Sequence, residues 1–431
     1  MQKTSLARYW LLIGVAALAI AGLYSLVLAG GRSPSLGESA LLARLFHKTL
    51  VVHVDLSVLV WFLAMACLLW SRLTQNFRSF IPYMEESALI CFVLGTAAIT
   101  FSPFDPNGEA LMSNYIPVIH SPVFFFGLML IFCGTLLMAV KVLTFSHWRQ
   151  QRSLGFALYS AALITVIAFA ALVWSYMQMP AVIDGQQYYD LLFWGGGHIL
   201  QFTHTQMLIV AWLMLTLFLS PEWQINHKAF HGIFWIGLVA TLVTPLPYVL
   251  FEITDAGHRS YFTQLMIVAG GLAPMLALWC IVPALWSCSR RNGCIAALIM
   301  SIALFFYGGV LGLMIEGQNV VIPAHYHGSI VGITLAFMGV VYLLLPGFGY
   351  RDVSGSRLAW VQPYIYGLGQ IMHVTGFAWS GGYGALRKTP GGAYEGTAKI
   401  AMGLMGGGAG LAAIGGLLFV VVVVRAVLKK N

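Results

Sequence analysis

Residues 322–332 read IPAHYHGSIVG, and they place His325 and His327 one residue apart at the start of a long apolar run. An ionisable side chain inside an apolar segment of membrane-spanning length is costly, so it is a candidate functional residue. In a helix each residue turns by about 100°, and the two imidazoles therefore point to opposite sides. Because neutral imidazole is a common ligand of haem iron, the pair predicts two separate cofactors, one on each flank.

Two further histidines, His53 and His198, fall at a similar depth in other apolar segments. When successive segments cross in opposite directions, at about 1.5 Å per residue, all four imidazoles lie roughly 9–14 Å below one membrane boundary. Histidines that only fill space would not be expected to share one layer. We therefore predict that the four residues serve cofactors or metals.

The composition indicates a membrane protein. Of 431 residues, 59% are hydrophobic and 8% are charged, and the mean hydropathy is +0.84. Soluble domains carry near 25% charged residues, and one membrane crossing needs about 20 apolar residues. We predict an all-α polytopic membrane bundle of twelve transmembrane helices that forms a single domain over residues 1–431. The predicted helices are 8–30, 44–72, 84–104, 116–141, 153–178, 190–219, 228–252, 261–287, 293–315, 319–346, 358–382 and 400–427.

The basic residues set the predicted orientation. Most of the 22 Lys and Arg residues fall in loops on the side that holds both termini. The positive-inside rule then places both termini in the cytoplasm, for a chain in a bacterial inner membrane. The net charge of +8 is thus a topology signal, and the predicted partner is the lipid bilayer, with no nucleic acid. No CxxCH sequence occurs, so no covalent c-type haem is expected.

Several motifs resemble subunit I of the haem–copper oxidase superfamily, which includes cytochrome c oxidases and nitric oxide reductases. AHYHG, opening the tenth predicted helix, resembles the AHFHY motif of that family. HVDLSVLVWF contains His53 and WGGGHILQF contains His198, and both resemble ligand-bearing segments of the same helices. RSYFTQLMIVAGG resembles the RAYFT segment, and GGYGALRKTPGG resembles the loop that binds haem propionates.

The resemblance implies two haems, for which haem b is favoured. His53 and His327 would be the axial ligands of a six-coordinate low-spin haem. His325 would be the proximal ligand of a five-coordinate haem whose open face is directed toward the sixth helix. Arg387 and Lys388 would neutralise the propionates. Other respiratory-complex subunits, and a c-type cytochrome or cupredoxin as electron donor, are the implied partners.

The sequence departs from this pattern at the second metal. The family's copper is held by a histidine matching His198 and by a His–His pair that should fall near Pro247 and Tyr248 in TPLPYVLFEITDAGHRSYF. Proline and tyrosine do not replace two imidazole ligands. Glu252, as a carboxylate ligand of non-haem iron, and His258, in the loop before the eighth helix, are the substitutes that the sequence offers. Copper, non-haem iron and the absence of a second metal all stay open, and the last is favoured.

Some polar residues have more than one interpretation. Tyr248 is a candidate for the redox tyrosine of the family, because Phe202 stands at the other position where that tyrosine occurs. Asp55, beside His53, is predicted either to hydrogen-bond a haem or to pack helices. The histidines without a family counterpart are predicted to be hydrogen-bonded bundle residues; they are His120, His231 and His373.

Three functions compete. The first is a terminal-oxidase-like oxidoreductase that passes electrons from the low-spin to the high-spin haem, where dioxygen or a nitrogen oxide binds. Its catalytic residues would be His325, His198 and Tyr248. The second is a copper-lacking relative that acts in haem electron transfer or gas sensing. The third is a transporter or structural subunit without haem, which would leave the shared histidine layer accidental.

Overall fold

The computed structural model describes residues 6–31, 40–75, 83–183, 185–286, 288, 291–315, 320–381 and 396–429. The elements form two compact units. Unit 1 comprises Met1–Val210 and Ile225–Ala277, and unit 2 comprises Ala211–Gln224 and Leu278–Asn431. Helices α7 (Gly185–Leu219) and α11 (Leu272–Trp286) contribute residues to both units.

Unit 1 is built from helices that pack mainly on their neighbours in sequence. Helix α1 packs on α2 and α3, α4 packs on α5, and α6 packs on α5 and α8. Their bounds are α1 Ala7–Gly31, α2 Ala40–Val54, α3 Trp61–Thr74, α4 Met84–Phe101, α5 Pro122–Phe145, α6 Arg152–Met177, α8 His227–Leu242, α9 Pro245–Leu250 and α10 Ala256–Leu265. A π-helical segment, Asp55–Val60, joins α2 to α3, and a second one, Met266–Gly270, follows α10.

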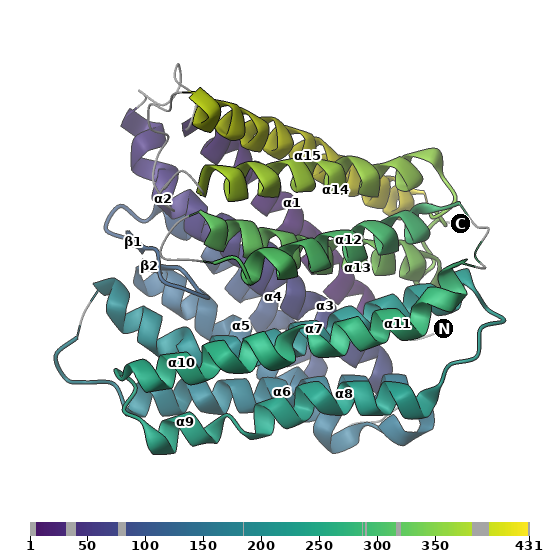
Figure 1. Cartoon of the computed structure of the whole chain (residues 1–431), viewed down its shortest axis with the longest axis horizontal. Helices are drawn as coiled ribbons and strands as arrows, with labels where there is room; N and C mark the ends of the chain where they lie inside the picture. Colours follow the sequence, from purple (N-terminus) through teal and green to yellow (C-terminus); the bar gives the residue numbers. More distant parts are fainter. Residues whose placement is uncertain are drawn as a thin grey trace. The chain divides into compact units, whose positions relative to one another are not determined.

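Unit 2 contains four helices besides the ends of α7 and α11: α12 (Gly293–Gly312), α13 (Val321–Leu344), α14 (Arg357–Gly381) and α15 (Gly396–Leu428). Helix α12 packs closely along α13, and α14 packs along α15 (Figure 1). Trp212 of α7 donates a hydrogen bond from its indole to the Ser301 hydroxyl of α12, at 2.8 Å. The described part of this unit is helical throughout, apart from its connections.

The structure confirms the predicted all-α polytopic membrane bundle. Within the described residues, eleven helical segments are long and apolar enough to cross a membrane. Helix α14, with 25 residues, is long enough at about 1.5 Å per residue but is less apolar than these. Several of its polar residues form hydrogen bonds inside unit 2. Buried Gln362, for example, accepts from Tyr342 at 2.9 Å and donates to the Gly415 carbonyl at 3.1 Å. Such internal hydrogen bonds make a polar helix tolerable in a membrane bundle.

One predicted helix begins later than expected. The sequence predicted a helix over 116–141, but α5 begins at Pro122, and residues before it form a two-stranded antiparallel hairpin. Strand β1 (Glu109–Leu111) pairs with β2 (Val118–His120), with Glu109 opposite His120. The apolar run 116–119 therefore lies in the hairpin, and its last two residues, Val118 and Ile119, belong to β2. Proline suits the first position of a helix, where its missing N–H is not needed, and this starts α5 at Pro122.

A buried ion pair joins α3, α4 and α5. The Lys141 ammonium and the Ser71 hydroxyl both donate to the Glu85 carboxylate, and all three residues are buried. A buried charge requires a partner because the interior solvates it poorly. The pair is therefore expected to fix how these three helices pack.

We expect Lys141→Met to destabilise the protein strongly, because it leaves the Glu85 charge buried without its ammonium partner. Breaking a buried pair from one side costs about 3–5 kcal/mol. The double variant Lys141→Met, Glu85→Gln should regain a large part of the loss, since glutamine is uncharged and still accepts from Ser71. Thermal unfolding in detergent measures the effect; equal melting temperatures of wild type and single variant would contradict it.

Candidate functional site

His325 lies where α12 and α13 are in close contact. A Cβ added at Gly328 would lie 2.6 Å from the Cα of Gly308, and one added at Gly332 would lie 2.7 Å from the Phe305 backbone nitrogen. Small residues allow such backbone-to-backbone approach in membrane helices. The glycines thus bring the start of α13 against the end of α12.

His325 projects from α13 toward α12 and is half-buried. Its Nδ1 lies 2.7 Å from the Gly308 carbonyl oxygen, so Nδ1 carries the proton and donates. A Cβ at Gly312 would lie only 2.6 Å from this Nδ1, and the glycine therefore makes room for the ring. No described residue forms a hydrogen bond with Nε2 of His325. A histidine that binds a metal through one nitrogen usually donates from the other to a carbonyl in this way.

His327 projects to the other flank of α13, toward α14. Its Nδ1 donates to the Pro323 carbonyl at 2.8 Å, and its ring centroid lies 5.4 Å from that of His373 and 5.6 Å from that of Phe377. His373 in turn donates from Nδ1 to the Met405 carbonyl of α15 at 2.8 Å. The opposite directions of His325 and His327 agree with the angle that the sequence spacing predicts.

His53 lies in unit 1 at the end of α2. Its Nδ1 donates to the Ala21 carbonyl of α1 at 2.8 Å, and the π-helical segment begins two residues later, at Asp55. π-helical turns are frequent at functional sites. Asp55 is buried, 1% exposed, and neither of its carboxyl oxygens forms a hydrogen bond with a described residue.

The three consecutive glycines before His198 each face a different neighbour. A Cβ at Gly195 would lie 2.9 Å from the Cζ of Tyr248, and one at Gly197 would lie 2.6 Å from a ring carbon of Tyr115. Gly196 faces the backbone of α6, 3.0 Å from a carbonyl oxygen. Three different neighbours therefore approach the α7 backbone closely at three successive positions, which explains the GGGH sequence.

His198 is 4% exposed, and both of its ring nitrogens are hydrogen-bonded. Nδ1 lies 2.7 Å from the Trp194 carbonyl and so carries the proton, while Nε2 lies 2.7 Å from the Tyr115 hydroxyl and so accepts from it. The rings of Trp194, Tyr115 and Phe262 surround the imidazole, with centroids 4.7, 4.7 and 5.4 Å away. In this conformation neither nitrogen is open to a metal.

Tyr115 comes from the tip of the β1–β2 hairpin, which the sequence did not predict. Its φ is +66°, in the left-handed region that bulky residues adopt at a cost of about 1–3 kcal/mol. The adjacent Asn114 N–H donates to the Asp190 carboxylate of α7 at 2.6 Å. Desolvation raises the pKa of the Tyr115 phenol well above its ordinary value, so the phenol keeps its proton and acts as the donor to His198.

The environment of His258 corrects one prediction. The sequence placed this residue in a loop, but it lies in α10 and is fully buried. Its ring packs against Tyr248 and Phe262, with centroids 4.9 and 5.3 Å away, and neither nitrogen forms a hydrogen bond with a described residue. The Tyr248 hydroxyl shares a hydrogen bond with the Ser175 hydroxyl at 2.9 Å and donates to a carbonyl of α6.

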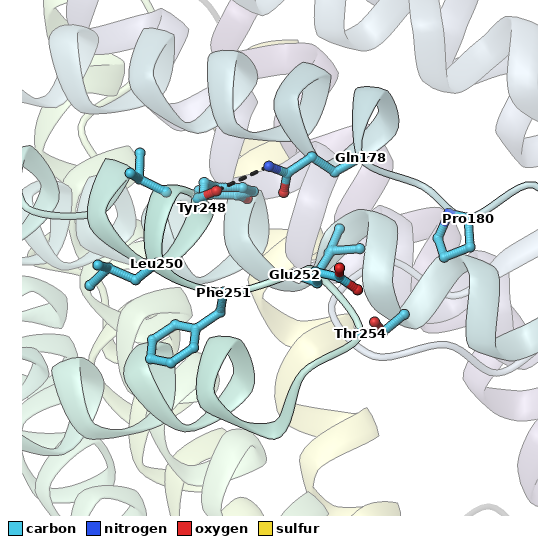
Figure 2. A pocket seen from close by; sticks show the side chains of 9 residues that line it. Gln178, Pro180, Tyr248, Leu250, Phe251, Glu252 and Thr254 are labelled. Carbon is cyan, nitrogen blue, oxygen red and sulfur yellow. Dashed lines mark hydrogen bonds between the residues drawn. The ribbon is translucent and has the colours of Figure 1, made fainter.

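Glu252 lines an open pocket of about 610 Å³ in unit 1, together with Tyr248. At this pocket the Gln178 side chain donates a hydrogen bond to the Tyr248 carbonyl at 3.0 Å (Figure 2). The Glu252 carboxylate is exposed and points toward Thr254 and Pro180. Among the described residues, no group of three or more His, Cys, Asp or Glu side chains is placed to hold a metal ion.

The predicted site residues thus fall into several environments. Arg387 and Lys388 lie outside the described residues. Sequence reasoning missed Tyr115 and the approach of His373 to His327. The DPNG sequence at 105–108 is a turn signal that could have revealed the hairpin. Such a turn marks a boundary, and here β1 begins directly after it, at Glu109.

The comparisons with known proteins agree with the architecture. No protein-family model matches the chain. The chain is 31% identical to an uncharacterized protein of Rickettsia prowazekii (strain Madrid E), across 97% of this chain and 95% of that protein. It is 28% identical to an uncharacterized protein of Aquifex aeolicus (strain VF5), across 80% and 86%. A heme-copper terminal oxidase dimer solved by cryo-EM has a similar fold, with a TM-score of 0.79, 16% identity, and coverage of 99% of this chain and 85% of that one.

We expect Gly197→Ala to destabilise unit 1, because the new methyl group would overlap the Tyr115 ring. Overpacking of this kind costs about 1–3 kcal/mol. Gly232→Ala in α8 is the matched control, since nothing lies within 4 Å of a Cβ there. Thermal unfolding followed by circular dichroism should show a lower melting temperature for Gly197→Ala only. If both variants melt with the wild type, the packing assigned to Gly197 is wrong.

Proposed function

This chain belongs to one family with the Rickettsia prowazekii protein, and we propose that it is the haem-bearing subunit of a membrane oxidoreductase, corresponding to subunit I of haem–copper oxidases. The observation that carries the proposal is His325. Its Nδ1 is fixed by the Gly308 carbonyl, and its Nε2 forms no hydrogen bond with a described residue. A half-buried imidazole in this state has the geometry of an axial haem ligand.

The residues around His325 fit a haem ligand. Gly308 supplies the carbonyl that fixes the tautomer, and Gly312 supplies the space for the ring. We propose that His325 is the single protein ligand of a five-coordinate haem. Such a haem supplies an iron that exchanges electrons and binds a small diatomic molecule.

A second haem is proposed from the resemblance, with His53 and His327 as its axial ligands. Each of these residues donates from Nδ1 to a backbone carbonyl, which leaves the ring oriented for ligation through Nε2. Arg387 and Lys388 are proposed to neutralise propionates, and haem b is the favoured type. The aromatic ring of Phe377 beside His327 provides part of the apolar surroundings that a porphyrin requires.

The proposed reaction is electron transfer to dioxygen or a nitrogen oxide. The electron donor would be a c-type cytochrome or a cupredoxin, and other respiratory-complex subunits would complete the enzyme. The chain would lie in a bacterial inner membrane with both termini in the cytoplasm, as the distribution of Lys and Arg indicates.

A second function is favoured by one observation, the two hydrogen bonds of His198. Because Nε2 of His198 already accepts from Tyr115, this residue is not prepared to bind a second metal. Glu252 is exposed, and His258 is enclosed by aromatic rings, so we do not assign a metal to them either. The alternative is therefore a copper-lacking relative that acts in haem electron transfer or gas sensing.

The first test is the haem content and spectrum of the purified protein. We expect two haems per chain by pyridine haemochrome. His325→Ala should remove only the high-spin haem that binds carbon monoxide, whereas His53→Ala and His327→Ala should remove the low-spin signal. His231→Ala, a bundle histidine of α8, is the control and should keep both. Unchanged spectra in all three ligand variants would refute the assignment.

A substitution that leaves the ligand residues unchanged tests the packing around His325. We expect Gly312→Ala to reduce the high-spin haem severalfold, because a methyl group 2.6 Å from Nδ1 displaces the imidazole. Gly309→Ala in the same helix should retain the haem, since nothing lies within 4 Å of a Cβ there. Optical carbon monoxide difference spectra measure the result, and equal haem in the two variants would contradict it.

A further inference from the structure

The resemblance implies a metal at His198, and the structure allows a test of whether this residue fits it. A metal binds the lone pair of an imidazole nitrogen that carries no proton. In His198 the proton is on Nδ1, which faces the Trp194 carbonyl at 2.7 Å. The available lone pair is therefore on Nε2, and the Tyr115 hydroxyl already donates to it at 2.7 Å. A metal and Tyr115 would compete for the same electrons.

We infer that Tyr115 takes the position of a metal ion on His198, so that this site is a metal-free, hydrogen-bonded phenol–imidazole pair. Tyr115 is then a positioning residue, which fixes the tautomer and the ring plane of His198. The inference concerns unit 1 alone, and it holds whether or not the haem proposal is correct.

Several contacts hold the hairpin tip so that Tyr115 reaches His198. The Asn114 N–H binds Asp190, one helical turn before Trp194 on α7. The ring of Tyr115 lies over Gly197, where any larger residue would exclude it. The left-handed backbone of Tyr115 is kept although it is unfavourable for tyrosine, so the contacts around it must compensate. The position of Tyr115 against His198 is thus fixed by several separate contacts within unit 1.

The other residues near His198 do not complete a metal site. Pro247 offers no side-chain ligand, and the Tyr248 hydroxyl is bonded to Ser175 and to a carbonyl of α6. His258 adds a single further imidazole, which is enclosed by Tyr248 and Phe262. Transition-metal sites in proteins usually need three or four protein ligands, and the described residues provide no such group.

The first experiment measures metal binding by the full-length protein in detergent. Wild type, Tyr115→Phe and His198→Ala are dialysed without oxygen against Cu(I), Fe(II) or Zn(II), and metal per chain is determined by elemental analysis after subtraction of haem iron. We expect no stoichiometric metal that depends on His198. One equivalent in the wild type that is lost in His198→Ala would overturn the inference.

The second experiment measures the hydrogen bond itself through melting temperatures. Tyr115→Phe and His198→Ala should each lower the melting temperature. The double variant should melt no lower than the less stable of the two single variants, because both changes remove the same interaction. Tyr176→Phe, an exposed phenol of α6, is the control and should combine additively with His198→Ala. Additive losses for Tyr115→Phe and His198→Ala would overturn the inference.

A conservative variant and a spectroscopic readout separate positioning from mere packing. His198→Gln keeps an oxygen that can accept from the Tyr115 phenol, so it should melt above His198→Ala although glutamine removes the imidazole. In protein labelled with ¹⁵N-histidine, the Nε2 resonance that disappears in His198→Gln should also shift in Tyr115→Phe. An Nε2 resonance that is unchanged by Tyr115→Phe would show that the phenol does not bind His198, and would overturn the inference.

Discussion

The candidate sites depend on one constraint, which is that four histidines inside membrane helices satisfy their ring N–H groups within the protein. Lipid offers no acceptor, so an unsatisfied N–H is costly. In His53, His198, His325 and His327, Nδ1 donates to a backbone carbonyl. This assigns the tautomer in each case and leaves Nε2 as the chemically active atom. What lies opposite Nε2 then decides the role of each residue.

Glycine determines where such rings can be placed. The imidazole of His325 needs the space at Gly312 and the carbonyl of Gly308, and the rings around His198 need Gly195 and Gly197. Glycine is unfavourable inside a helix by about 1 kcal/mol relative to alanine. In these helices the cost is offset by close packing and by the hydrogen bonds that the short distances permit. The same residues therefore serve both stability and the site.

The two groups of histidines differ in how their second nitrogen is used. His325 presents Nε2 without a hydrogen bond from a described residue, which suits a ligand that arrives from outside the chain. His198 presents Nε2 to a phenol of the same chain, which is delivered by a hairpin with a left-handed residue at its tip. A fold similar to that of a heme-copper terminal oxidase thus holds a buried histidine whose second nitrogen accepts a hydrogen bond from a phenol of the same chain.

The sequence by itself determined the all-α membrane bundle, because apolar runs of about 20 residues have no other stable arrangement in lipid. It also determined that His325 and His327 point apart, since this follows from helical periodicity. Only the tertiary structure decided that His258 is buried, that His373 meets His327, and that Tyr115 caps His198. These contacts join residues far apart in the chain, and no local pattern encodes them. Whether a buried imidazole binds a cofactor or a neighbour depends on which atom reaches its lone pair, and packing decides that.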